Sequence, residues 1–121
     1  MPLRCLIVDD NRSFLEAARV LLEREGLTVV GVASTSAEAL RQVELLRPDV
    51  VLVDISLGEQ SGLDLARRLF GDCQRGEATV ILISTRAEEE YAELIAACPA
   101  TGFLPKAELS AAAIRRIADG H

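Results

Sequence analysis

Tryptophan is absent from this chain of 121 residues, and aromatic residues make up only 3% of it. Half of the residues are nonetheless hydrophobic, so the core must be built from Leu, Val, Ile and Ala. A chain of this length can bury one ordinary core but is too short for two. We therefore expect one compact domain over residues 1–121.

Long hydrophobic runs are also missing. No stretch approaches the ~20 apolar residues that a membrane-spanning helix needs. The first apolar run, residues 5–8, stops at Asp9 and Asp10, so the N-terminus lacks the apolar region of a secretory signal. These absences predict a soluble, cytoplasmic protein that does not bind a membrane.

Cysteine and positive charge are both scarce. The three cysteines (Cys5, Cys73 and Cys98) are scattered and contain no C-x-x-C pair, which favours free thiols over a disulfide or a zinc site. The 13 Lys and Arg are outnumbered by 19 Asp and Glu, giving a formal net charge of −6. Because no basic stripe stands out, direct contact with nucleic acid is not expected.

Short apolar runs ending in polar residues are what the chain does contain. In Val50–Asp54, four apolar residues lead directly into a carboxylate. Such a run does not alternate between apolar and polar residues, so both faces of the strand should be buried, as in a parallel sheet. Apolar runs of this kind predict five strands, over residues 3–8, 27–33, 50–54, 79–83 and 101–104.

Segments with apolar residues at helical spacing separate these strands. Asn11 or Ser13 can cap the first helix, Gly26 should end it, and residues 35–38 have the form of a capping box. Residues 55–61 should be a loop because they contain turn-forming glycine. The predicted helices cover about residues 12–24, 35–47, 63–70, 87–97 and 108–118.

Strands that alternate with helices predict a doubly wound α/β fold, in which right-handed crossovers place helices on both faces of one five-stranded parallel sheet. The inward helical positions should be Phe14, Ala17, Ala18, Leu21 and Leu22 in the first helix, Ala39, Leu40, Val43 and Leu46 in the second, and Leu109, Ala112, Ala113 and Ile117 in the last.

Polar side chains gather where these strands end. Asp9 and Asp10 follow the first strand, Asp54 ends the third, Ser84 follows the fourth and Lys106 follows the fifth. In a doubly wound sheet with strand order 2-1-3-4-5, the carboxyl ends of these strands meet at one edge. All five residues should therefore surround one shallow pocket.

The chemistry of this group points to phosphoryl transfer. Three clustered carboxylates repel one another, and hard oxygen ligands suit Mg²⁺. Lys106 and the Ser84 hydroxyl supply a positive charge and a hydrogen-bond donor for a phosphoryl group. Since a carboxylate can act as a nucleophile, Asp54 is the best candidate to form an acyl phosphate.

Along essentially its full length, the chain resembles the receiver domain of two-component response regulators. The resemblance rests on residues 6–10, 50–54, 83–84 and 102–106, together with Gly62. Any one of these segments alone is a weak signal, but all five lie at the right ends of the right strands. The resemblance implies a flavodoxin-like receiver fold.

The resemblance also implies a metal site. Asp54 matches the phosphorylated aspartate, and Asp10 matches the acid that binds Mg²⁺ directly. Asp9 matches the acid that acts mostly through water. Ser56, two residues beyond Asp54, matches the position whose backbone carbonyl completes the magnesium site.

Further roles follow for the residues around the phosphoryl group. Ser84 matches the hydroxyl residue that reaches toward a phosphoryl oxygen, and Lys106 matches the lysine that pairs with it. Phe103 falls where the family keeps a switch aromatic, which turns inward as Ser84 moves. Two arrangements of a hydroxyl and a ring form a small bistable element that phosphorylation can bias.

Three parts of the rim depart from the family pattern. Pro105 precedes Lys106, whereas the family commonly has proline after the lysine, often with a cis bond. Residues 56–58 replace the usual Met-Pro and should leave that loop more flexible. Thr85 stands where the family often has Ala. None of these changes removes a charged residue from the site.

Each of these residues also has a purely structural interpretation. An aspartate such as Asp54 often forms the turn after a buried strand, and Asp9 can simply cap a helix. Lys106 alone would be an ordinary surface lysine, and Phe103 alone a core residue. Their joint occurrence favours the functional interpretation.

Three functions remain open. The first is a signalling switch phosphorylated by a sensor histidine kinase or a phosphotransfer protein, which catalyses only its own phosphoryl transfer and autodephosphorylation. The second is a pseudo-receiver that binds a partner without phosphorylation. The third is a phosphohydrolase, disfavoured because Ser56 occupies the position of the usual second acid.

A homodimer would use the face formed by the fourth helix, fifth strand and fifth helix. The chain is expected to be either a stand-alone receiver or the N-terminal part of a longer regulator.

Overall fold

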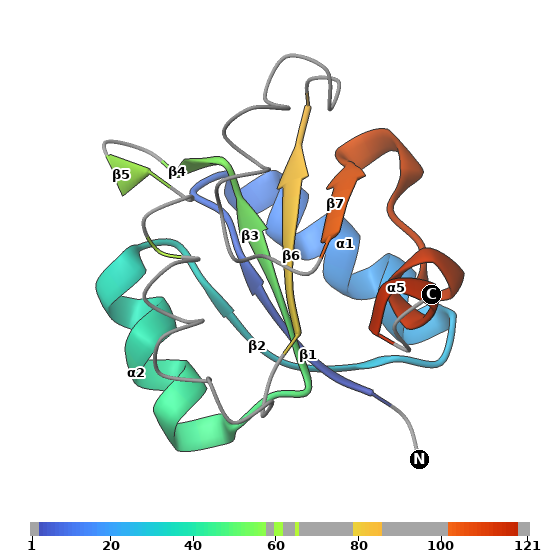
Figure 1. The fold of residues 1–121 in the computed structure, drawn as a ribbon, viewed down its shortest axis with the longest axis horizontal. Coiled ribbons are helices and arrows are strands. Elements are labelled where there is room, and N and C mark those ends of the chain that lie inside the picture. Colours follow the sequence, from blue (N-terminus) through green and yellow to red (C-terminus); the bar gives the residue numbers. More distant parts are fainter. Residues whose placement is uncertain (1–2, 58–59, 62–64, 66–78, 86–101, 119–121) are drawn as a thin grey trace.

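A computed structural model describes residues 3–57, 60–61, 65, 79–85 and 102–118 (Figure 1). Its centre is a five-stranded parallel sheet in the order β2-β1-β3-β6-β7. The strands are β1 (Arg4–Val8), β2 (Thr28–Ala33), β3 (Val50–Asp54), β6 (Thr79–Ser84) and β7 (Gly102–Pro105). Since β6 and β7 are the fourth and fifth strands of this sheet, the predicted order 2-1-3-4-5 is confirmed.

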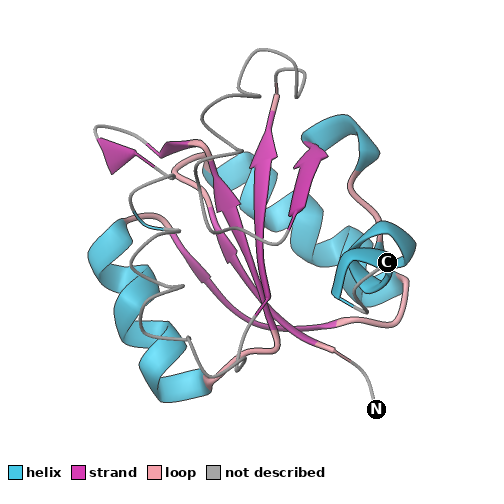
Figure 2. Cartoon of the chain, viewed as in Figure 1, coloured by secondary structure: helices cyan, strands magenta, loops and turns pink. Residues whose placement is uncertain are grey.

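Helices lie on both faces of the sheet (Figure 2). The helices with described bounds are α1 (Arg12–Arg24), α2 (Ser36–Leu46), α5 (Ala111–Ala118) and the short 3₁₀ helix η2 (Lys106–Glu108). None of the helices in the described part of the chain has the length and apolar character needed to cross a membrane.

Alternate residues of the central strands supply two separate cores. On one face, Ile7 and Leu52 pack with Leu22 of α1 and Ile114 of α5. On the other, neighbouring residues such as Val53 pack with helix α2. All five residues of β3 are buried, as the absence of alternation predicted.

Helix α1 begins and ends as its sequence predicts. Asn11, rather than Ser13, is the N-cap, because its side chain accepts a hydrogen bond from the Phe14 amide at 3.1 Å. At the other end, Gly26 adopts a φ of +97°. The Gly26 amide donates to Glu23 O and the Leu27 amide donates to Leu22 O, which is the Schellman arrangement.

The capping box of α2 forms with one change in register. Thr35 Oγ1 accepts a hydrogen bond from the Glu38 amide at 3.1 Å, as predicted. The Glu38 carboxylate accepts from the amide of Ser34 at 3.1 Å, one residue before the cap. Both hydrogen bonds satisfy backbone donors at the start of the helix.

The prediction of a loop over residues 55–61 was wrong in part. Strands β4 (Ser56–Leu57) and β5 (Gln60–Ser61) form a small antiparallel hairpin, in which Ser56 pairs with Ser61. Short strands of two residues carry no hydrophobic periodicity, so nothing in the sequence distinguished them from a loop. The peptide bond between Lys106 and Ala107 is trans, since the described residues contain no cis bond.

The start and the phase of the last helix also differ from the prediction. Residues 106–108 form η2, and α5 begins only at Ala111, where Ser110 Oγ accepts from the Ala113 amide at 3.1 Å. Ala112 is therefore exposed, and Ile114 is buried instead. Similarly, Ala17 of α1 is exposed while Leu15 is buried. Alanine, which fits either side of a helix, marks the inner face poorly.

Two predicted helices fall largely outside the described residues. Of the segment 63–70, only Leu65 is described, and it is buried in the same core as α2. The segment 87–97 lies wholly outside the described part. The predicted dimer face that includes this segment is therefore described only at β7 and α5.

Candidate active site

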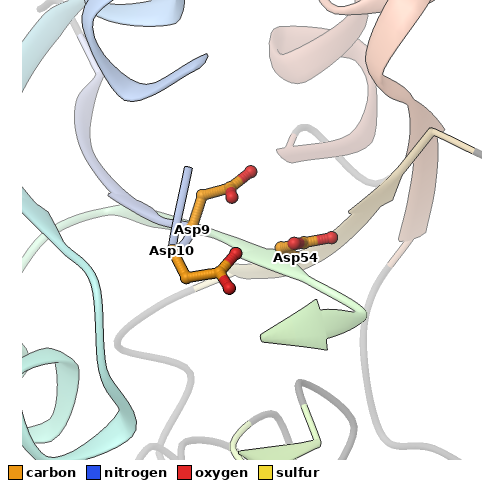
Figure 3. A group of neighbouring side chains, drawn as sticks. All are labelled: Asp9, Asp10 and Asp54. Atoms are coloured by element: carbon orange, nitrogen blue, oxygen red, sulfur yellow. The ribbon is translucent and has the colours of Figure 1, made fainter. Parts of the chain in front are cut away.

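Two of the predicted acids lie at the ends of adjacent strands. Asp9 follows β1 directly and Asp54 is the last residue of β3, while the register pairs Val8 with Val53. β2 and β3 lie on opposite sides of β1, and such a reversal of strand order opens a crevice at the carboxyl ends. One carboxylate oxygen from each of Asp9, Asp10 and Asp54 lies within 4.8 Å of the other two (Figure 3).

The three carboxylates differ in their contact with solvent. Asp9 is fully buried, Asp54 is 6% exposed and Asp10 is exposed. Asp9 is held by two hydrogen bonds: its amide donates to Ala33 O at 3.0 Å, and its Oδ1 accepts from the Asn11 amide at 2.9 Å. The turn after β1 thus fixes one acid and leaves its neighbour open to solvent.

Lys106 supplies the positive charge of the site. Its Nζ atom lies 2.5 Å from Asp9 Oδ2 and 3.8 Å from Asp54 Oδ2. Among the described residues, Lys106 is the polar partner of Asp9 Oδ2, and their contact is an ion pair. The lysine bridges the two buried acids, as its predicted position after the fifth strand allows.

Phe14 is a site neighbour that sequence reasoning assigned only to the core. Lys106 Nζ lies 4.2 Å from the centroid of the Phe14 ring. Phe14 is in the first turn of α1, three residues after the N-cap Asn11. A helix that begins two residues after Asp10 must hold its first turn close to the acids. This spacing in the sequence could have indicated that Phe14 lies near the site.

The predicted switch residues lie on neighbouring strands. Ser84, the last residue of β6, is 3% exposed and pairs in register with Pro105, next to Lys106. Phe103 of β7 is partly buried and packs against the core on the α2 face. Ser56 begins β4, two residues beyond Asp54. The strands thus bring Ser84 to the same edge of the sheet as the acids.

The donor set fits a divalent cation. Three carboxylates converge, and Lys106 offsets only one of their negative charges. Mg²⁺ is bound in proteins through one or two carboxylates and keeps several waters, which the exposed Asp10 side of the site can accommodate. A cation here would relieve the repulsion among the acids.

Comparison with known proteins identifies the family of this chain. The family model described as the response regulator receiver domain matches residues 5–118. Response regulator GacA of Pseudomonas viridiflava is 30% identical over 105 residues, which cover 86% of this chain and 48% of that protein. Other relatives are protein-glutamate methylesterases. This chain spans between about a fifth and about half the length of such relatives.

Solved structures agree with the sequence relatives. The receiver domain of the NarL regulator of Mycobacterium tuberculosis superimposes with a TM-score of 0.84 at 26% identity, covering 99% of this chain and 98% of that one. A Burkholderia pseudomallei response regulator gives 0.79 at 28% identity, covering 95% of this chain and 65% of that one. The latter structure is described as containing a phosphorylated aspartic acid and a calcium ion.

Proposed function

The chain belongs to the response regulator receiver domain family, and on that premise we propose that Asp54 accepts a phosphoryl group and so switches the domain. The donor is a sensor histidine kinase or a phosphotransfer protein. One observation carries the proposal: Asp54 ends a buried strand within 4.8 Å of two further carboxylates, with the Lys106 ammonium beside it.

The residues of the site have complementary roles in this reaction. An oxygen of Asp54 attacks phosphorus and forms an O–P bond, while the bond from phosphorus to the donor nitrogen breaks and the electron pair leaves with the imidazole. Lys106 and the Ser84 hydroxyl stabilise the charge on the transferred oxygens. Ser84 is 3% exposed and the Lys106 side chain is 13% exposed, so water screens these interactions weakly.

Asp9, Asp10, Asp54 and the backbone of Ser56 would hold Mg²⁺. Bound there, the ion neutralises charge on the phosphoryl oxygens and on the acids around them. The convergence of the three carboxylates supports this assignment. The Burkholderia regulator structure, described as containing a phosphorylated aspartic acid and a calcium ion, is consistent with this assignment.

Phosphorylation then changes the surface around Ser84 and Phe103. Ser84 and Phe103 lie on adjacent strands, so a hydroxyl drawn toward the phosphoryl group can alter the space available to the ring. Dimerisation would use β7, α5 and the segment 87–97. The domain catalyses only the transfer of the phosphoryl group onto Asp54 and the later hydrolysis of the acyl phosphate. It acts in the cytoplasm and contacts neither nucleic acid nor membrane directly.

Incubation with acetyl phosphate and Mg²⁺ tests the proposal. Intact-mass measurement should show one added phosphoryl group in the wild type and none in Asp54→Asn, whose amide is a poor nucleophile. Equal uptake by the two proteins would exclude Asp54 as the acceptor. No uptake by a folded wild type, and no Mg²⁺-dependent change in its NMR spectrum, would favour the pseudo-receiver instead.

A further inference from the structure

The Lys106 ammonium lies close to two acids, Asp9 and Asp54, and to one aromatic ring, that of Phe14. Its Nζ lies 2.5 Å from Asp9 Oδ2, 3.8 Å from Asp54 Oδ2 and 4.2 Å from the centroid of the Phe14 ring. The lysine side chain is only 13% exposed, so water competes weakly for the ammonium. An ammonium within about 6 Å of a ring centroid is attracted by the ring quadrupole.

A closed series of contacts joins Phe14 to the acid pair. Asp9 Oδ1 accepts from the Asn11 amide, and the Asn11 side chain accepts from the Phe14 amide. The Phe14 ring contacts Lys106, whose Nζ returns to Asp9 Oδ2. The first turn of α1 therefore fixes the acid and the ring that faces its lysine at the same time.

Phe14 combines core packing with its contact to Lys106. It is partly buried and packs against the core cluster that contains Leu15, Ala18 and Leu22. A leucine at position 14 would fill a similar apolar space. What only an aromatic side chain adds there is a negative ring face for the ammonium.

We propose that Phe14 is a positioning residue for Lys106: its ring, together with the carboxylates of Asp9 and Asp54, holds the ammonium at the phosphoryl site. This rests on the proposed function. A lysine carries four rotatable side-chain bonds, so its free ammonium would sample many positions. Because the ring has no lone pair, it attracts the ammonium without competing as a strong acceptor for its protons.

The first experiment measures the position of Lys106 without any phosphate. In NMR spectra of the wild type, ring current from Phe14 should shift the Lys106 ε-methylene protons upfield. Phe14→Leu should abolish this shift, and Phe14→Tyr should retain it. An unshifted signal in the folded wild type would overturn the proposal.

The second experiment measures the rate of phosphorylation by acetyl phosphate in a double-mutant cycle. Phe14→Leu should slow the reaction about 3- to 30-fold, and Phe14→Tyr should restore most of the rate. In a Lys106→Ala background the same leucine substitution should change the residual rate less than twofold, because its effect acts through the lysine. Equal effects in both backgrounds would contradict the proposal.

A matched control separates positioning from loss of stability. Leu22→Val weakens core packing two turns further along α1 and should leave the rate per folded molecule unchanged. Failure of the proposed function looks different from failure of this inference. If the proposed function is wrong, the wild type takes up no phosphate. If only this inference is wrong, the wild type is phosphorylated and Phe14→Leu is phosphorylated at the same rate.

Discussion

The Nζ atom of Lys106 lies 2.5 Å from Asp9 Oδ2 but 3.8 Å from Asp54 Oδ2. The lysine thus makes its closer ion pair with Asp9 rather than with Asp54, the proposed acceptor, although both acids belong to the proposed metal site. A cation bound by Asp9 and Asp10 must share the same carboxylate with the ammonium. Since like charges repel, lysine and metal oppose each other at Asp9.

Removing the lysine charge should therefore tighten metal binding while impairing phosphoryl transfer. We expect Lys106→Ala to raise Mg²⁺ affinity about 3- to 30-fold, because the competing positive charge is lost. An NMR titration with Mg²⁺ measures the dissociation constant. Lys106→Arg, which keeps the charge, is the control and should bind Mg²⁺ much as the wild type does. Weaker binding by the alanine variant would show that Lys106 supports the metal site instead.

Much of the fold follows from the sequence because the central strands are hydrophobic without interruption. That pattern arises when both faces of a parallel sheet are covered, and the aspartates that end two of these runs mark the carboxyl edge. Asp9 and Asp54 could therefore be placed together before any coordinates. The order of the strands came from a common arrangement of doubly wound sheets rather than from any residue of this chain.

The rest depends on contacts that leave no local pattern. Which acid Lys106 approaches depends on how a long side chain lies in three dimensions, and its contact with Phe14 joins residues 92 positions apart. The hairpin of β4 and β5 has too few residues for periodicity. The late start of α5 was hidden by consecutive alanines, which suit either face of a helix.

Arg4 should stabilise the end of helix α2. Its guanidinium donates to Arg47 O at 3.0 Å and to Leu46 O at 2.7 Å, where carbonyls lack partners within the helix. Arg4→Ala should lower the free energy of unfolding by about 1–3 kcal/mol, because both charge-assisted hydrogen bonds are lost. Arg4→Lys should recover only part of this, since an ammonium lacks the planar fork. Urea unfolding followed by circular dichroism measures the difference.

The control for Arg4 is the exposed Arg41 on the surface of α2. Arg41→Ala removes the same charge and should change the free energy of unfolding by less than about 0.5 kcal/mol. If Arg4→Ala has no larger effect, the two hydrogen bonds at the helix end contribute nothing to stability.

Glu25 should hold helix α5 against the end of α1. Its Oε1 accepts a hydrogen bond from the Ala111 amide at 2.7 Å, so a carboxylate sits at the positive end of the helix. Glu25→Ala should destabilise the protein by about 1 kcal/mol and speed hydrogen exchange of the Ala111 amide. Glu25→Gln, which keeps an acceptor, should have a smaller effect. Glu23→Ala, which removes a surface pair with Arg19, is the control. Similar exchange rates of the Ala111 amide in both alanine variants would show that Glu25 does not hold α5 in place.

Cys5 should make stability fall with rising pH above neutrality. Burial raises the pKa of its thiol from 9.0 to about 11; the nearby Asp49 carboxylate adds to the rise, and Arg115 opposes it. In the unfolded chain the thiol ionises near pH 9 while the folded protein keeps it protonated, so stability present below pH 9 is lost as the pH rises to about 11. The loss should approach ~3 kcal/mol at most. Urea unfolding of the wild type and of Cys5→Ala should be compared between pH 8 and 11, a range set by the two pKa values. Because the two proteins share every other group that titrates there, the comparison isolates the Cys5 thiol. The difference between the two proteins should shrink steadily across the range; parallel curves would mean that Cys5 ionises equally in both states.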